Sequence, residues 1–140
     1  MNGMKNIIIM EVLKKEITKQ GIDVLFVTET FLSAQKQIEL RKVFGEYDVY
    51  FRSRKEKEGK KYLERGGVMC IARKGTVKLE RECRSDDLMF VMCKGMVLCC
   101  AYFVPSTSPF EKFNEARMIE LQERILQCRK EVMIFTDSNA

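Results

Sequence analysis

The chain has 140 residues, 46% of them apolar, and 25 lysines and arginines against 20 acidic residues give a net charge of +5. This length and apolar content allow one globular domain with a real core and exclude collagen-like, low-complexity and disordered classes. Histidine is absent, which excludes histidine-ligated metal sites, Ser-His-Asp chemistry and imidazole catalysis within this chain, so any activity must rest on carboxylates, hydroxyls, amides or thiols.

The first predicted elements are a helix over 6–20 and a buried strand over 24–27. The apolar stripe expected to face inward from the helix is Ile9, Val12, Leu13 and Ile17. Gly21 follows at the place where a helix would end, and the strand is a continuous apolar run, typical of a strand covered on both faces. A helix that leads directly into such a strand indicates a layered protein of helices and sheets.

The middle of the chain predicts several strands in succession. Their ranges are 47–51, 67–72, 77–83, 88–93 and 96–104. Turns separate them, and one of these, Lys94-Gly95, interrupts an apolar stretch that would otherwise be long enough to span a membrane. We therefore expect these strands to form one antiparallel meander.

A second amphipathic helix and a last strand complete the predicted elements. The helix runs from 110 to 128 and begins at Ser108 or Pro109. Its expected apolar face is Phe113, Met118, Leu121, Ile125 and Leu126. The strand, 132–135, is apolar throughout and is expected to be buried. The predicted fold class is mixed α/β (α+β), a single domain over 1–140 with a mainly antiparallel sheet and flanking helices.

The six cysteines favour a reducing compartment. They lie within apolar runs, without a CxxC pair or partner histidines, so they predict small buried side chains rather than a zinc site. The N-terminus carries no apolar signal core followed by a cleavage site. We therefore expect an intracellular protein, in the nucleus or cytoplasm, that is neither secreted nor inserted in a membrane.

Two acidic residues stand at the carboxyl ends of predicted strands. Glu29 follows the strand that starts at residue 24, and Asp137 follows the strand that starts at residue 132. Strand ends are where layered α/β proteins build sites, and two carboxylates brought together there could hold Mg²⁺ and orient a water. The alternative is that both residues are simply polar exits from their strands, since spacing alone does not make the strands neighbours.

A basic segment separates two of the predicted strands. Its cations are Arg52, Arg54, Lys55, Lys57, Lys60, Lys61 and Arg65. Seven positive charges in fourteen residues could follow a phosphate backbone, which predicts binding of nucleic acid. The alternative is a solvated surface loop.

Five short motifs occur in order along the chain. They are Asn2-Gly3-Met4, similar to the end of an N-x-N-G-hydrophobe element; DVLFVTET at 23–30, similar to a strand ending in Q/T-E-T; RGGVMCIARKG at 65–75, similar to R-G-G-V-x-I/L-x-x-R; 102–106, similar to Y-x-P-P-S; and 136–140, similar to G-D-F-N-A. In this order they resemble the endonuclease/exonuclease/phosphatase superfamily, most closely the endonuclease domains of non-LTR retrotransposons and their apurinic-endonuclease relatives.

The resemblance implies a sandwich of two sheets flanked by helices, with one Mg²⁺ at a rim and hydrolysis of a phosphodiester in DNA by in-line attack of water. Glu29 and Asn2 would belong to the metal site. Asp137 would position or deprotonate the water, and Asn139 would donate to a phosphate oxygen. Tyr102 would contact the scissile phosphate, although an alignment shifted by one residue would place Phe103 there.

The chain also departs from the family pattern. It matches little more than the first half of the family domain, so we expect a partial four-layer α/β-sandwich truncated after the G-D-x-N-like strand. The family's S-D-H element, with its histidine, has no counterpart among these residues. We therefore expect the isolated chain to be inactive or nearly so, to self-associate through uncovered sheet surfaces, and to belong with a missing C-terminal half or a reverse-transcriptase domain.

Two classes of function stay open from the sequence. The first is a fragment of a Mg²⁺-dependent DNA endonuclease of retrotransposon type. The second is a non-catalytic remnant, or a module that binds nucleic acid or protein with the half-fold. A phosphatase or lipid phosphodiesterase of the same superfamily is a weaker alternative within the enzyme class.

Overall fold

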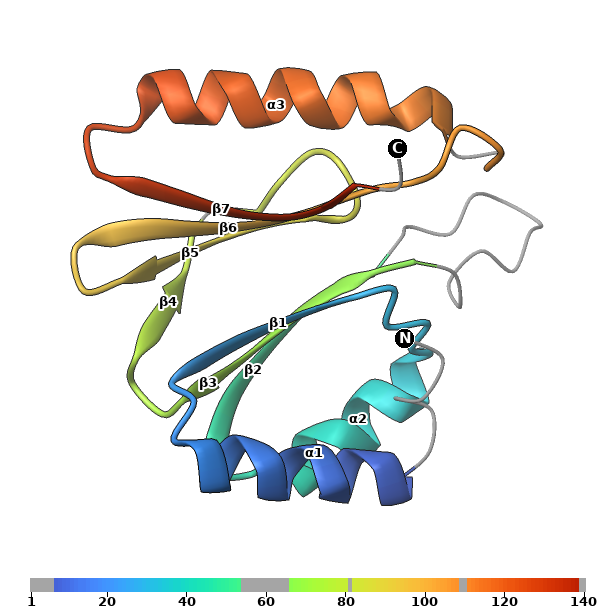
Figure 1. The fold of residues 1–140 in the computed structure, drawn as a ribbon, viewed down its shortest axis with the longest axis vertical. Coiled ribbons are helices and arrows are strands. Elements are labelled where there is room, and N and C mark those ends of the chain that lie inside the picture. The colour runs from blue at the N-terminus through green and yellow to red at the C-terminus, as the bar shows by residue number, and fades with distance from the viewer. Residues whose placement is uncertain (1–6, 54–65, 81, 109–110, 139–140) are drawn as a thin grey trace.

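Two β-sheets stack face to face, and helices cover the outer side of each (Figure 1). The structure is a computed structural model that describes residues 7–53, 66–80, 82–108 and 111–138. The layers run helix, sheet, sheet, helix, which confirms the predicted partial four-layer sandwich with mainly antiparallel sheets. Within the described ranges, no helix is long and apolar enough to cross a bilayer.

The first sheet is antiparallel, with strand order β1-β3-β2. Its strands are β1 (Val24–Thr28), β2 (Tyr47–Arg52) and β3 (Val68–Arg73). Its outer face is covered by α1 (Ile7–Gln20) and α2 (Ala34–Val43). α2 is not among the helices predicted from the sequence. Its N-cap is Ser33, whose hydroxyl oxygen accepts from the Lys36 amide at 3.3 Å.

The second sheet has the order β4-β5-β6-β7. Its strands are β4 (Val77–Leu79), β5 (Leu88–Cys93), β6 (Met96–Phe103) and β7 (Val132–Ser138). The first three are antiparallel neighbours, whereas β7 runs parallel to β6. A 3₁₀ turn (Glu111–Phe113) and α3 (Asn114–Gln127) form the connection that makes this parallel pairing feasible.

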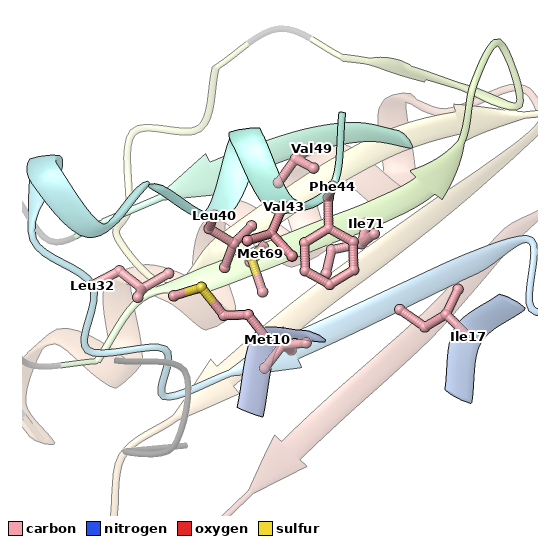
Figure 2. Packing of buried hydrophobic residues seen from close by; sticks show 10 residues of the cluster. Met10, Ile17, Leu32, Leu40, Val43, Phe44, Val49, Met69 and Ile71 are labelled. Carbon is pink, nitrogen blue, oxygen red and sulfur yellow. The ribbon is translucent and has the colours of Figure 1, made fainter. Parts of the chain in front are cut away.

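Three apolar layers hold these elements together. Figure 2 shows the layer under α1 and α2, where Met10 and Phe44 pack against Met69 and Ile71 of β3. A second layer fills the space between the sheets, and a third lies between the second sheet and α3, whose Leu121 is 6% exposed. The central strands β3, β5 and β6 are therefore mainly buried, whereas the edge strands are partly exposed.

The predicted meander is wrong. β2 and β3 pair in the first sheet, but β4 pairs with β5 in the second, so the chain crosses between sheets at the Lys74–Thr76 turn. A crossing turn and a hairpin turn use the same residue types, and the sequence therefore could not distinguish them. By contrast, Lys94-Gly95 is the expected tight turn, with φ of 49° and 81°, which matches a two-residue hairpin.

The last strand is present but not buried, contrary to the prediction. Met133, Ile134 and Phe135 are 40–47% exposed, because β7 is at the edge of its sheet and pairs only with β6 among the described strands. An apolar run therefore identified the strand but not its edge position.

Both long helices bury only part of the stripe that was predicted to face inward; Ile17 of α1 and Leu121 of α3 are buried as expected. In α1, Met10 and Ile17 are buried while Val12 is 55% exposed, because apolar residues almost surround the first turns and two stripes have helical spacing. In α3, Met118 and Leu126 are exposed. The inner face of α3 also carries two charged residues, Arg117 and Glu120, each 2% exposed.

Glu120 anchors α3 to the loop between β4 and β5. Its carboxylate accepts from the backbone amides of Arg84 at 2.8 Å and Ser85 at 2.7 Å. Burial alone would raise the pKa of Glu120, but these amides, the Ser85 hydroxyl and the Arg124 guanidinium together lower it below the ordinary value of 4.5. The buried charge is therefore stabilised by its partners.

Glu120→Gln should lower the free energy of unfolding near neutral pH by about 1.5–3 kcal/mol, the usual contribution of a hydrogen bond to a charged group. Because the folded pKa is lowered, this stabilisation is fully present above pH 4.5 and is lost as the pH falls through the folded pKa. Urea unfolding from pH 7 to pH 3 should show the two proteins converging. Glu123→Gln, which removes a half-exposed carboxylate on the next turn, should change the stability by less than about 0.5 kcal/mol.

Candidate functional site

The turn after β1 places Glu29 at the end of the first sheet. Glu29 and Phe31 both have φ of 51°, which is unusual for residues other than glycine. Two backbone bonds to the start of β3 hold this turn: the Thr30 amide donates to Gly67 O at 3.3 Å and the Phe31 amide to Gly66 O at 2.9 Å. The conformation of the turn is therefore imposed by its neighbours.

Gly67 must be glycine for this contact to form. Its φ is 92°, and a Cβ there would lie 2.8 Å from the Thr30 hydroxyl oxygen, with Arg52 O at 3.5 Å and Ser53 Cα at 3.8 Å. Thr30 is itself 2% exposed. The paired glycines of the RGGV motif therefore allow β3 to approach the Glu29 turn closely.

Tyr102 of β6 meets Glu29 across the space between the sheets. Its ring is 3% exposed, and its hydroxyl donates to a carboxylate oxygen of Glu29. Phe103 is on the opposite face of β6 and packs in the layer under α3. Of the two residues left open by the sequence alignment, Tyr102 is thus the one that faces Glu29.

Asp137 reaches the same place from β7. It is the register partner of Tyr102 in the parallel β6–β7 pair, so both side chains leave the same face of the sheet. Its carboxylate accepts from the Thr28 hydroxyl of β1 at 3.1 Å. The structure therefore brings together Glu29, Tyr102 and Asp137, which lie far apart in the sequence.

An open groove reaches Asp137 of this group. Its volume is about 330 Å³, and it runs between β1 and the β6–β7 pair, with Thr28 and Asp137 in its lining. Phe26 and Phe135 face each other in it with ring centroids 5.6 Å apart. Asp137 is thus accessible from an apolar groove, whereas Tyr102 lies buried between the sheets.

A buried polar network that was not predicted from the sequence lies beside the site. Asp87 has no exposed surface, and its carboxylate accepts from Gly67 N at 2.6 Å and from Arg117 Nη2 at 3.0 Å. Arg117 also donates to Asn114 Oδ1 at 2.8 Å. One signal was present: Arg117 comes four residues before Leu121 and four after Phe113, so it put a charge on the stripe expected to be apolar.

The remaining predicted residues are only partly placed. Arg52 is described: its guanidinium donates to Glu82 and to the carbonyls of Cys83 and Ser85, tying β2 to the loop between β4 and β5. Its contact with nucleic acid stays a prediction. The other predicted site residues lie outside the described residues: Asn2, Asn139, Arg54, Lys55, Lys57, Lys60, Lys61 and Arg65.

The cysteines do not contribute ligands to this site. Cys70, Cys83, Cys99 and Cys100 are buried. Burial raises the pKa of the Cys70 and Cys100 thiols to about 12 and that of Cys83 to about 11, so they stay protonated at neutral pH. Thiolate coordination of a soft metal is therefore unfavourable there.

The donors at the site do suit a hard cation. Glu29 and Asp137 offer carboxylate oxygens, with the hydroxyls of Tyr102 and Thr28 beside them. Mg²⁺ is commonly held by one or two carboxylates and keeps several waters, so this oxygen set is sufficient in kind. In the described part of the chain, no three acidic, cysteine or histidine side chains cluster, so the set is not a complete protein cage.

Comparisons with known proteins identify the fold. No protein-family model and no curated protein matches the sequence. Among solved structures, an AP endonuclease from Archaeoglobus fulgidus is similar with a TM-score of 0.64 and 17% identity, over 91% of this chain and 51% of that chain. TDP2 from D. rerio, complexed with a single-strand DNA product, is similar with a TM-score of 0.59 and 15% identity, over 100% of this chain and 56% of that one.

A third similar structure is the human nocturnin catalytic domain with bound sulfate, with a TM-score of 0.52 and 14% identity, over 94% of this chain and 56% of that chain. All three belong to one superfamily, the one that the sequence motifs resemble, and this confirms the prediction at the level of the fold. The chain spans about half the length of each of these structures.

Proposed function

We propose that this chain, which has the fold of the endonuclease/exonuclease/phosphatase superfamily, is the part of a phosphodiester hydrolase that binds the metal and the nucleic acid, of the retrotransposon endonuclease type. One observation supports the proposal most strongly. Glu29, Tyr102 and Asp137, each predicted from a different motif, converge at one edge of the sandwich.

In this proposal, the carboxylates of Glu29 and Asp137 hold Mg²⁺, with Asn2 as a further oxygen donor. When bound, the cation neutralises charge on a phosphate oxygen. The Tyr102 hydroxyl orients the Glu29 carboxylate, and the Thr28 hydroxyl orients that of Asp137. Oriented donors lower the reorganisation required at the site, which is the usual source of electrostatic catalysis.

The same proposal gives roles at the reacting phosphate. Asp137 is an acceptor that can receive a proton from water, and Asn139 can donate to a phosphate oxygen. Tyr102 can do the same only by turning its single hydroxyl proton from Glu29 to the phosphate when the substrate binds. The groove between β1 and the β6–β7 pair gives the substrate access to Asp137. Its apolar wall favours a nucleotide base or sugar over a fully charged ligand.

The basic segment is proposed as the contact to DNA. It connects β2 to β3, and the described residues at its start and just after its end lie at this edge of the fold: Arg52 pairs with Val68, and Gly66 accepts from the turn that follows Glu29. A similar structure, D. rerio TDP2, is complexed with a single-strand DNA product, which supports nucleic acid as the ligand class. Cations placed beside the metal site would hold the phosphate backbone there.

A binding module without activity is the second candidate. The sequence contains no histidine, so no imidazole within the chain can stabilise the scissile phosphate or protonate a leaving group. In this version, the metal and DNA sites persist while hydrolysis by the isolated chain is absent or very slow. Both candidate functions require the chain to bind the metal and DNA.

Glu29→Gln should weaken Mn²⁺ binding at least about tenfold, or roughly 1.4 kcal/mol, because a charged ligand is replaced by a neutral one. Isothermal titration with Mn²⁺ measures the change. Asp23→Asn is the matched control, since Asp23 flanks the opposite end of β1 and pairs with Arg73 at 3.4 Å. Equal affinity in wild type and Glu29→Gln, or equal loss in the control, would contradict the metal site.

Replacing Lys57, Lys60 and Lys61 by glutamine should weaken DNA binding and reduce the salt dependence of its affinity. Each lost phosphate contact lowers the slope of log K against log salt by about 0.9 for duplex DNA, so the expected decrease is about 2–3. Fluorescence anisotropy with labelled duplex DNA measures the slope. Replacing Lys14, Lys15 and Lys19 of α1 changes the net charge equally, and a similar decrease there would show that the segment has no special role.

A further inference from the structure

We propose that Asp87 is a positioning residue of the Glu29–Tyr102 site: it fixes the distance between the two sheets at this edge and thereby holds the Tyr102 hydroxyl on the Glu29 carboxylate. The inference rests on the proposed function for the meaning of the site, but its geometry does not depend on metal or DNA. Asp87 belongs to none of the motifs that carry the superfamily resemblance.

Asp87 touches both sheets directly. Its carboxylate Oδ1 accepts from the Gly67 amide of the first sheet at 2.6 Å. Its own carbonyl accepts from the Tyr102 amide of the second sheet at 3.0 Å. One residue with no exposed surface thus bonds to the backbone of both halves of the site.

Gly67, which donates to Asp87, is also bonded directly to the turn that carries Glu29. The carbonyls of Gly66 and Gly67 hold the amides of Phe31 and Thr30, the residues that follow Glu29. Because Glu29 and Phe31 have positive φ, this turn depends on those two bonds to keep its shape. A displacement of Gly67 would therefore move the Glu29 carboxylate.

The other carboxylate oxygen fixes Asp87 itself. Oδ2 accepts from Arg117 Nη2 at 3.0 Å, while Arg117 Nε donates to the Asp86 carbonyl at 2.9 Å. Arg117 is aligned in turn by Asn114, which also bonds to both the amide and the carbonyl of Val104 at 3.2 and 2.9 Å. Val104 lies two residues beyond Tyr102, so the strand end that carries Tyr102 is held from both sides.

Burial makes the Asp87–Arg117 ion pair resistant to displacement. Both side chains are at most 2% exposed, and a buried charge that loses its partner is strongly unfavourable. The pair therefore tolerates little change in separation. Asp87 also has φ of 58°, a conformation kept only where surrounding contacts impose it.

The test uses the whole chain labelled with 3-fluorotyrosine and observed by ¹⁹F NMR. The chain has four tyrosines, and Tyr102→Phe assigns the resonance of Tyr102. Glu29→Gln first defines the shift that follows weakening of the Tyr102–Glu29 contact. Asp87→Asn should move the Tyr102 resonance in the same direction while leaving those of Tyr47 and Tyr50 unchanged.

Glu120→Gln is the matched control. Glu120 is also a buried carboxylate that accepts from two backbone amides and pairs with arginine, but it contacts the loop at Arg84 and Ser85 rather than the site. Its variant should leave the Tyr102 resonance in place. If Asp87→Asn does not fold, Arg117→Lys, which keeps the charge but loses the planar fork, should produce a smaller shift of the same sign.

The inference is overturned if the Tyr102 resonance stays at its wild-type position in folded Asp87→Asn or Arg117→Lys, or if Glu120→Gln moves it equally. Adding Mn²⁺ to the wild type tests the proposed function separately, since a bound paramagnetic ion should broaden the Tyr102 resonance. A shift in Asp87→Asn without broadening by Mn²⁺ would support the positioning role and reject the metal site.

Discussion

The buried ion pair between Asp87 and Arg117 is the interaction on which the arrangement of this protein depends. Apolar layers can hold two sheets and three helices together, but burial is non-directional and leaves their relative position loosely defined. A buried charged pair with several further hydrogen bonds is directional, and breaking one partner typically costs about 3–5 kcal/mol. Through this pair, α3, the end of β6 and the start of β3 keep one relative position.

That position determines the chemistry at the edge of the sandwich. Glu29 follows an edge strand of one sheet, Asp137 lies in an edge strand of the other, and Tyr102 extends between the sheets toward Glu29. Each oxygen donor has a hydrogen-bond partner on the opposite sheet, either Tyr102 with Glu29 or Thr28 with Asp137. The site is therefore a property of the contact between sheets, and neither sheet contains it alone.

The sequence predicted most elements, because apolar periodicity is local. The order of the motifs predicted the four-layer fold and the proximity of Glu29 to Asp137. Residue spacing alone could not predict that proximity, because the two residues lie far apart in the sequence. The misses concern long-range packing. α2 was not predicted because its apolar residues are few, although Ser33 is a good N-cap. The inner face of α3 was assigned to apolar residues, whereas Arg117 and Glu120 face inward to bind loop backbone that only the folded chain brings near.

The most direct test of this account is a crystal structure of the chain soaked with Mn²⁺ and measured at an anomalous wavelength. The account predicts one strong anomalous peak in contact with carboxylate oxygens of Glu29 and Asp137, with the Asp87–Arg117 pair intact beside it. A peak elsewhere, or Glu29 and Asp137 on different edges of the sandwich, would contradict it.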